Sequence, residues 1–192
     1  APYLAIEGTA VAQRLGATVA DVGDVDGDGI SDFAVSIPGA RTVQIYSGLS
    51  TEPFKRLIAS IEVSLTDPAF AGFGEVINGV GDVNNDGFAD IVITPDEGGG
   101  PRVRIFSGKD FTQIADFFGI QDVNFRGGAR AAVGDLNNDD VGDIAVSAGF
   151  GGGPRVAVFS GATLTSNGGP KLFGDFFIFE PTLRNGAFVA LT

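Results

Sequence analysis

The chain has 192 residues, 44% of them hydrophobic and 19% charged, so it encodes a folded protein rather than a disordered acidic tail. Its formal net charge of −12 excludes a nucleic-acid partner and insertion at an anionic membrane, and it favours cations as ligands. Cysteine and histidine are absent, which excludes disulfides, thiolate metal sites and histidine acid–base catalysis. The chain starts at Ala1 and contains no methionine, so we expect a mature or excised segment.

Three copies of one pattern follow one another along the chain. Each copy begins with Gly-Asp and ends in Ser-Gly, at residues 23–48, 81–108 and 134–161. Each predicts four short strands. The first precedes an acidic loop, at 17–22, 75–80 and 129–133. The second follows the loop, at 33–37, 91–94 and 144–147. The third runs to the Ser-Gly pair, at 42–47, 102–107 and 155–160. The fourth is less regular, at 55–61, 112–118 and 171–179.

The pattern of side chains distinguishes these strands. The second strands are nearly all apolar, which predicts burial on both faces. The third strands alternate, as in "RVRIF", which predicts half-exposed strands. Four short strands per repeat are typical of propeller blades. The sequence therefore predicts an all-β fold built from blades of four antiparallel strands.

The repeat also predicts the organisation of the chain. Three complete blades occupy 15–72, 73–125 and 126–182, residues 1–14 hold the outer strand of a preceding blade, and 183–192 hold the first strand of a following blade. Three blades do not close a ring. Either the segment belongs to a larger propeller or repeat array, or separate subunits complete one another in a ring or a head-to-tail filament. Because the last residues, "GAFVALT", are apolar and uncharged, we expect self-association that deletion of 183–192 reduces.

The acidic loops predict metal sites. Carboxylates and amides recur at loop positions 1, 3, 5 and 9, and this alternate spacing lets a loop wrap a hard cation with oxygen ligands. The predicted side-chain ligands are Asp24, Asp26, Asp28 and Asp32 in the first loop, Asp82, Asn84, Asp86 and Asp90 in the second, and Asp135, Asn137, Asp139 and Asp143 in the third. Position 7 adds the backbone carbonyls of Ile30, Phe88 and Val141.

All of these donors are oxygen atoms, which favours Ca²⁺, with Mg²⁺ as the second candidate. Three Ca²⁺ ions would change the formal charge from −12 to −6, because each ion adds two positive charges. The alternative is a set of Asp/Asn/Gly turns whose charges are solvated. In the third loop Asp140 replaces the glycine found at Gly29 and Gly87, so a positive φ at this position would suit that loop less well.

The loops, the "FG" at Phe73–Gly74 and the "YSG" or "FSG" strand ends resemble FG-GAP (VCBS-type) repeats, the calcium-binding blades of integrin-α-like β-propellers and of many bacterial surface proteins. The resemblance covers essentially the whole chain. It implies an extracellular or cell-surface location, in a bacterium, and a structural or adhesive role with a protein or glycan ligand. A carbohydrate-binding lectin, or a propeller appended to a polysaccharide-active enzyme, is the alternative. "FG" is replaced by Leu15–Gly16 and Arg126–Gly127 in the other repeats.

No catalytic residue is assigned, because the clustered carboxylates are explained by the ion loops. Asp116 and Asp122 could serve a glycosidase in principle, but nothing distinguishes this pair. The "GGGPR" segments at 98–102 and 151–155 lack a Walker lysine and read as linkers between the second and third strands, with Arg102 and Arg155 paired to acidic groups. Phenylalanines near the blade ends favour packing between blades over sugar-stacking platforms.

Overall fold

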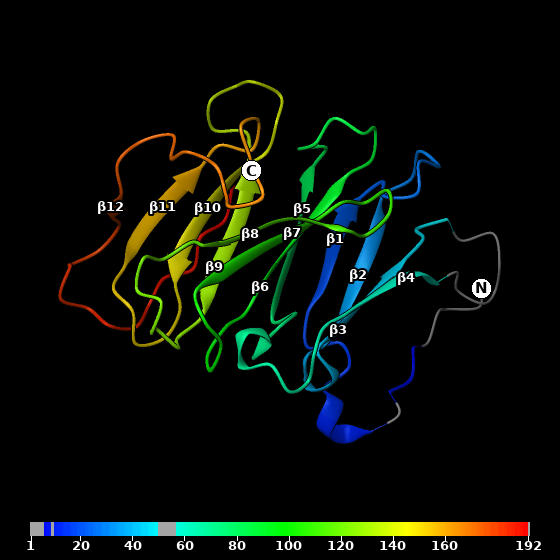
Figure 1. Cartoon of the computed structure of the whole chain (residues 1–192), viewed down its shortest axis with the longest axis horizontal. Helices are drawn as coiled ribbons and strands as arrows, with labels where there is room; N and C mark the ends of the chain where they lie inside the picture. Colours follow the sequence, from blue (N-terminus) through cyan, green and yellow to red (C-terminus); the bar gives the residue numbers. More distant parts are fainter. Residues whose placement is uncertain (1–5, 9, 50–56, 192) are drawn as a thin grey trace.

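A computed structural model describes residues 6–8, 10–49 and 57–191 of the chain. In these residues it contains twelve β-strands and three short 3₁₀ turns, η1 (Val11–Gln13), η2 (Pro38–Ala40) and η3 (Pro68–Phe70) (Figure 1). The strands form three four-stranded antiparallel sheets. The first sheet comprises β1 (Val19–Gly23), β2 (Asp32–Ile37), β3 (Thr42–Tyr46) and β4 (Leu57–Glu62). The second comprises β5 (Val76–Gly81), β6 (Asp90–Thr94), β7 (Arg102–Phe106) and β8 (Gln113–Phe118). The third comprises β9 (Ala129–Gly134), β10 (Asp143–Ala148), β11 (Arg155–Phe159) and β12 (Phe176–Phe177).

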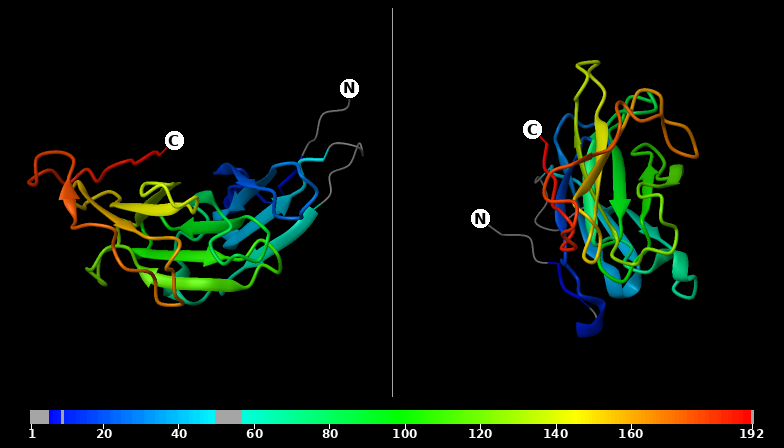
Figure 2. Two further views of the ribbon diagram at one scale, coloured as in Figure 1. Left: turned by 90° about the horizontal axis from the view of Figure 1, so that it is seen from above. Right: turned by 90° about the vertical axis from the view of Figure 1, so that its left-hand side faces the viewer.

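Each sheet is a meander in which neighbours in sequence are neighbours in space, as the repeat predicts. The first strands of consecutive sheets, β1, β5 and β9, lie next to one another. Figure 2 shows the three sheets following one another in a curved row, with β4 and β12 toward its outer sides. This is the arrangement of propeller-like blades, and the all-β prediction is confirmed.

Two apolar layers hold the row together. Between the first and second sheets, Ile45 of β3 packs in one cluster with Ile91 and Ile93 of β6. Between the second and third sheets, Val103 of β7 packs with Ile144 of β10. These side chains are fully buried, and each contributes about 1.5–3 kcal/mol relative to an exposed position. As predicted, β6 and β10 are buried along their whole length.

The prediction of half-exposed third strands is wrong. In β7 every residue after Arg102 is buried, and β11 is buried in the same way after Arg155. The alternation predicted an exposed side chain at Arg104 of "RVRIF", but this arginine is only 1% exposed. Its guanidinium lies in an ion pair with Asp116, with 3.4 Å between Nε and Oδ2, and over the ring of Phe70.

The fourth strand of the third sheet is much shorter than the predicted 171–179. Only Phe176 and Phe177 form β12, and Lys171 makes an isolated bridge to Phe159. Gly174 interrupts the segment, and glycine weakens a strand because it adds no packing side chain. Phe173, Phe176, Phe177 and Phe179 are therefore partly exposed rather than packed between blades, in contrast to the buried Phe117 and Phe159.

The terminal segments differ from the predicted orphan strands. Residues 1–5, 9 and 192 lie outside the described residues, and 6–8 and 10 are not in a strand. Residues 183–191 form no strand either, but they lie against the third sheet. The Ala187 N–H donates to the carbonyl of Ala148 at 3.0 Å, and Val189 and Leu191 pack on the apolar face of that sheet. This backbone hydrogen bond and the side-chain packing hold the segment on the sheet without a strand ladder.

Candidate metal centre

The three acidic loops occupy equivalent places in the three sheets. Each connects the first strand of a sheet to the second, between β1 and β2, β5 and β6, and β9 and β10. Because β1, β5 and β9 run in the same direction in Figure 1, all three loops lie at the same end of the strands. The repeat therefore places three equivalent clusters of oxygen donors at one end of the molecule.

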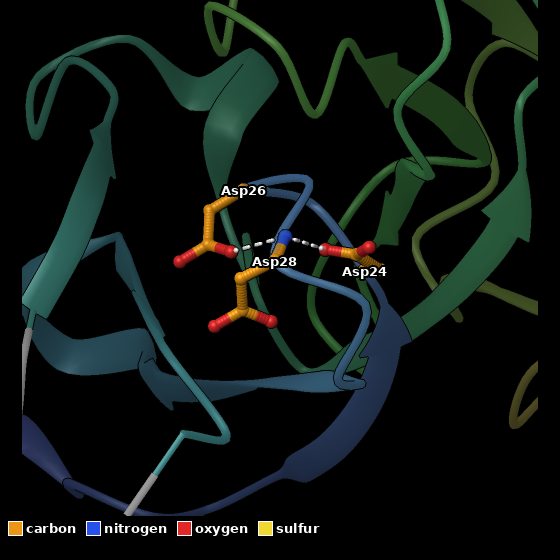
Figure 3. A group of neighbouring side chains, drawn as sticks. All are labelled: Asp24, Asp26 and Asp28. Atoms are coloured by element: carbon orange, nitrogen blue, oxygen red, sulfur yellow. Dashed lines mark hydrogen bonds between the residues drawn. The ribbon is translucent and has the colours of Figure 1, made fainter. Parts of the chain in front are cut away.

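The first loop brings three carboxylates together. One carboxylate oxygen from each of Asp24, Asp26 and Asp28 lies within 4.8 Å of the others (Figure 3). The backbone folds around them, because the Asp28 N–H donates to Asp24 Oδ1 at 3.1 Å and to Asp26 Oδ1 at 3.2 Å. Three negative charges this close repel one another unless a cation lies between them.

The second and third loops have the same hydrogen-bond pattern with asparagine at position 3. Asn84 Nδ2 donates to Asp86 Oδ2 at 3.0 Å, while Asn84 Oδ1 accepts from the Asp86 N–H at 3.0 Å. Asn137 and Asp139 repeat both contacts, at 2.9 and 3.1 Å. Each of these loops thus has one carboxylate fewer than the first at the predicted ligand positions, although Asp140 adds a carboxylate at position 6 of the third loop.

The backbone of the loops requires residues that tolerate left-handed conformations. At position 6, φ is +85° for Gly29, +91° for Gly87 and +65° for Asp140, so the expectation that Asp140 replaces a glycine at positive φ is confirmed. Position 4 is left-handed as well, at Gly27, Asn85 and Asn138. Asparagine and glycine are the residues that adopt this conformation most readily, which explains their presence in the loops.

The last aspartate of each loop is buried and clamps the loop to the third strand. Asp90 is fully buried, and its Oδ2 accepts from the Val83 N–H at 3.0 Å while its Oδ1 accepts from the Gly108 N–H at 3.1 Å. Burial raises the pKa of Asp90 to about 6, against these two hydrogen bonds, and the nearby Asp86 and Asp82 raise it further. Asp32 and Asp143 make the corresponding pairs of bonds, to Val25 and Gly48 and to Leu136 and Gly161.

These clamps explain the Ser-Gly ends of the third strands, whose role the spacing of the loops did not predict. A Cβ atom on Gly48, Gly108 or Gly161 would overlap a backbone carbonyl oxygen of the neighbouring strand connection. The serine also contributes in the second sheet, where Ser107 Oγ donates to Asp86 Oδ2 at 2.9 Å. Burial alone would raise the pKa of Asp86, but hydrogen bonds from Ser107, Asn84 and the Phe88 N–H lower it below its ordinary value.

The donor set fits a hard divalent cation. The side-chain donors of the first loop are carboxylate oxygens, and those of the second and third loops are carboxylate and amide oxygens. Imidazole nitrogen and thiolate sulfur ligands do not occur, because the chain has no histidine or cysteine. At position 7 the N–H groups of Ile30, Phe88 and Val141 donate to the aspartate at position 5, at 2.9, 3.1 and 3.0 Å. Ligation by their carbonyls, and the complete ligand sets, remain predictions.

Three propeller-like blades with acidic loops between their first and second strands define a class of repeat proteins. Residues 82–146 match the family of FG-GAP-like repeats, and the chain therefore contains an FG-GAP-like repeat. It is distantly related to integrin alpha chains. It is 30% identical to integrin alpha-V of Gallus gallus over 176 residues, which is 82% of this chain and 16% of that protein. It is 35% identical to integrin alpha-4 of Xenopus laevis over 95 residues, which is 45% of this chain and 9% of that protein.

The chain thus spans less than a fifth of the length of these relatives. Among solved structures, a rhamnogalacturonan lyase, YesW, is similar with a TM-score of 0.47 and 14% identity, over 73% of this chain and 31% of that one. In the part of the chain that the structure describes, no helix is long and apolar enough to cross a membrane.

Proposed function

We propose that this chain is an extracellular, calcium-stabilised binding module with a structural or adhesive role. The observation that carries the proposal is the threefold repetition of one loop hydrogen-bond pattern, together with the three carboxylates gathered in the first loop. Asp24, Asp26, Asp28, Asp32 and the Ile30 carbonyl would hold the ion in the first loop. Asp32 also holds the loop against the end of β3, through the N–H groups of Val25 and Gly48. Bound Ca²⁺ would supply the positive charge that these carboxylates lack.

The ions act on stability in this proposal rather than on a substrate. Each loop ties the first two strands of a sheet together and, through its last aspartate, reaches the third strand. Neutralising the loop therefore stabilises three of the four strands of a blade. A ligand that binds only the folded state stabilises it by RT ln(1 + [L]/Kd), which is about 2.7 kcal/mol at a hundredfold excess over Kd.

The surroundings of the remaining carboxylates support a non-catalytic role. Asp116 pairs with Arg102 at 2.6 Å and with Arg104 at 3.4 Å. Asp122 Oδ1 accepts from the Asn124 N–H at 3.0 Å and caps a turn. Both members of this carboxylate pair thus have structural partners, which is not the arrangement of an acid–base pair poised around a glycosidic bond.

Calcium titration calorimetry tests the proposal. We expect saturable Ca²⁺ binding to more than one site and a weaker response to Mg²⁺, which prefers a tighter octahedron. Asp28→Ala should remove binding at the first loop, whereas Asp140→Ala, which removes a carboxylate outside the predicted ligand positions, should leave the number of sites unchanged. Absence of binding to the folded wild-type protein would contradict the proposal.

A carbohydrate-binding role is the second candidate. It is favoured by partly exposed phenylalanine rings beside arginines at the end of the blades opposite the acidic loops. Self-association is a further part of the proposal. We infer that it uses the terminal apolar face of the third sheet, which residues 183–191 cover in the single chain, and sedimentation over a range of concentrations measures it.

A further inference from the structure

Two clefts repeat in consecutive blades. The blade-2 cleft, of about 240 Å³, is lined by Gly100, Arg102, Phe118 and Arg126. The blade-3 cleft, of about 350 Å³, is lined by the corresponding residues Gly153, Arg155, Phe177 and Arg184. The arginines Arg102 and Arg155 are the first residues of β7 and β11, and directly follow the Gly-Gly-Gly-Pro linkers. Both clefts thus use a sequence motif that the calcium loops do not.

The two clefts share their hydrogen bonds as well as their residue types. Arg126 Nη1 donates to the carbonyls of Val123 and Phe125, at 2.9 and 2.8 Å. Arg184 Nη1 donates to the carbonyls of Pro181 and Leu183, at 2.8 and 2.7 Å. In both blades the carbonyl of this arginine accepts an N–H of the glycine linker, from Gly98 and Gly151, at 2.9 Å. The same turn is therefore docked on the same linker twice.

Positive charge exceeds negative charge in both clefts. Two arginines line each cleft, Arg102 and Arg126 in the blade-2 cleft and Arg155 and Arg184 in the blade-3 cleft. The first of each pair has a carboxylate partner outside the lining, Asp116 for Arg102 and Asp175 for Arg155, at 2.6 and 3.3 Å. The second, Arg126 or Arg184, makes no ion pair within the described residues.

One carboxylate lines each cleft, and both of these carboxylates cap turns. Asp67 Oδ1 accepts from the Ala69 N–H at 2.9 Å, and Asp122 Oδ1 accepts from the Asn124 N–H at 3.0 Å. Two arginines therefore stand against one carboxylate in the lining of each cleft, in a protein whose net charge is −12. Such a local excess of guanidinium groups selects an anionic ligand, and the planar fork of arginine matches a carboxylate.

An aromatic ring adjoins the cations. The Arg102 guanidinium lies over the Phe118 ring, 4.8 Å from its centroid, and Phe118 is 39% exposed. Phe177, at the equivalent place, is 52% exposed. An apolar face beside a carboxylate-binding group suits a sugar ring that bears a carboxylate, because the ring has both an apolar face and a charged edge.

We propose that the two clefts bind consecutive stretches of one linear acidic polysaccharide, each cleft taking a uronate carboxylate. The proposal rests on the binding role given above and names its ligand class. Repetition of the cleft in successive blades favours a ligand whose own units repeat, since the second contact is then intramolecular and adds avidity. The acidic loops do not oppose this, because β6 and β10 run from the loops to the glycine linkers and so separate the two ends.

The test uses the whole chain in excess Ca²⁺ and short oligomers of galacturonate, glucuronate and mannuronate, with carboxyl-reduced oligomers of the same backbones as controls. We expect the wild type to bind at least one acidic oligomer, and its reduced form at least about tenfold more weakly. Arg126→Gln and Arg184→Gln should each weaken binding by about tenfold, whereas Arg126→Lys and Arg184→Lys, which keep the charge but lose the planar fork, should weaken it by a smaller factor. Arg14→Gln is the matched control, because it removes the same charge from an exposed pair with Glu75 outside both clefts.

Melting curves of the same samples keep the two proposals distinguishable. A wild type that Ca²⁺ stabilises but that binds none of the oligomers would overturn the polysaccharide assignment and leave the calcium proposal standing. Equal binding of poly-glutamate would overturn it in favour of an acidic protein partner. Should both glutamine variants misfold, binding of reduced oligomers as tightly as acidic ones by the wild type would also contradict it.

Discussion

The left-handed position of the third loop gives a quantitative prediction. Asp140 has φ +65°, where Gly29 and Gly87 stand in the other loops at +85° and +91°. A Cβ atom at either glycine would meet no heavy atom within 4 Å, so the cost of a side chain here comes from the backbone alone. That cost is roughly 1 kcal/mol for an L-residue, and it is smaller for Asp and Asn than for other types.

Asp140→Gly should therefore stabilise the protein by removing this backbone cost. Part of the gain is offset, by about 0.5 kcal/mol, because glycine raises the conformational entropy of the unfolded chain. Because the backbone cost is below 1 kcal/mol for Asp, the net expectation is an increase of less than about 0.5 kcal/mol in the free energy of unfolding. Gly87→Asp should lower it by a similar amount. Urea unfolding with excess chelator measures both, and Asp140→Asn separates the removed charge from the relieved backbone. The reasoning is refuted if Asp140→Gly is no more stable than Asp140→Asn.

Three further predictions concern charge and packing. With chelator present, the free energy of unfolding of the wild type relative to Asp90→Asn should fall as pH rises from about 4 to 6, by no more than about 3 kcal/mol. The sign follows because the pKa of Asp90 is raised to about 6 in the folded state, so the folded protein binds more protons than the unfolded chain in this window; a rise with pH would contradict it. Asp116→Ala should lower the free energy of unfolding, measured in urea, by about 3 kcal/mol, because it leaves the buried Arg104 without its carboxylate. Arg104→Met should change it by less than about 1 kcal/mol, because Asp116 keeps its ion pair with Arg102. Equal losses in the two variants would count against this explanation. Deletion of 183–192 should increase self-association measured by sedimentation, because residues 183–191 cover the apolar face formed by Ala145, Val156 and Val158. This is the reverse of the expectation from the sequence. Decreased association of the deletion variant would contradict it.

The sequence predicted those features that depend on local pattern. Short-range spacing located eleven of the twelve described strands to within about two residues at each end, and it identified Asp140 as the residue standing at a glycine position. Features that depend on contacts between distant segments were not predictable. The clamp from Asp90 to Gly108 joins residues of different strands, and only the folded sheet shows why that glycine tolerates no side chain.

The same limit applies to the third strands and the C-terminal segment. Polar and apolar residues do alternate in "RVRIF", but the burial of Arg104 depends on Asp116 and Phe70, which come from other parts of the chain. Residues 183–191 have the composition of a strand, yet they form no strand ladder and are held by the hydrogen bond from Ala187 to Ala148 and by side-chain packing. The clefts required the structure as well, because each combines residues from a glycine linker, a fourth strand and the following turn.

Thermal unfolding of the wild-type chain in excess Ca²⁺ and in excess chelator tests the central claim most directly. If the loops bind ions in the folded state alone, Ca²⁺ raises the melting temperature in a concentration-dependent manner. Asp28→Ala should reduce this increase, and Asp140→Ala should preserve it. Superimposable melting curves of the wild type with calcium and with chelator would contradict the account.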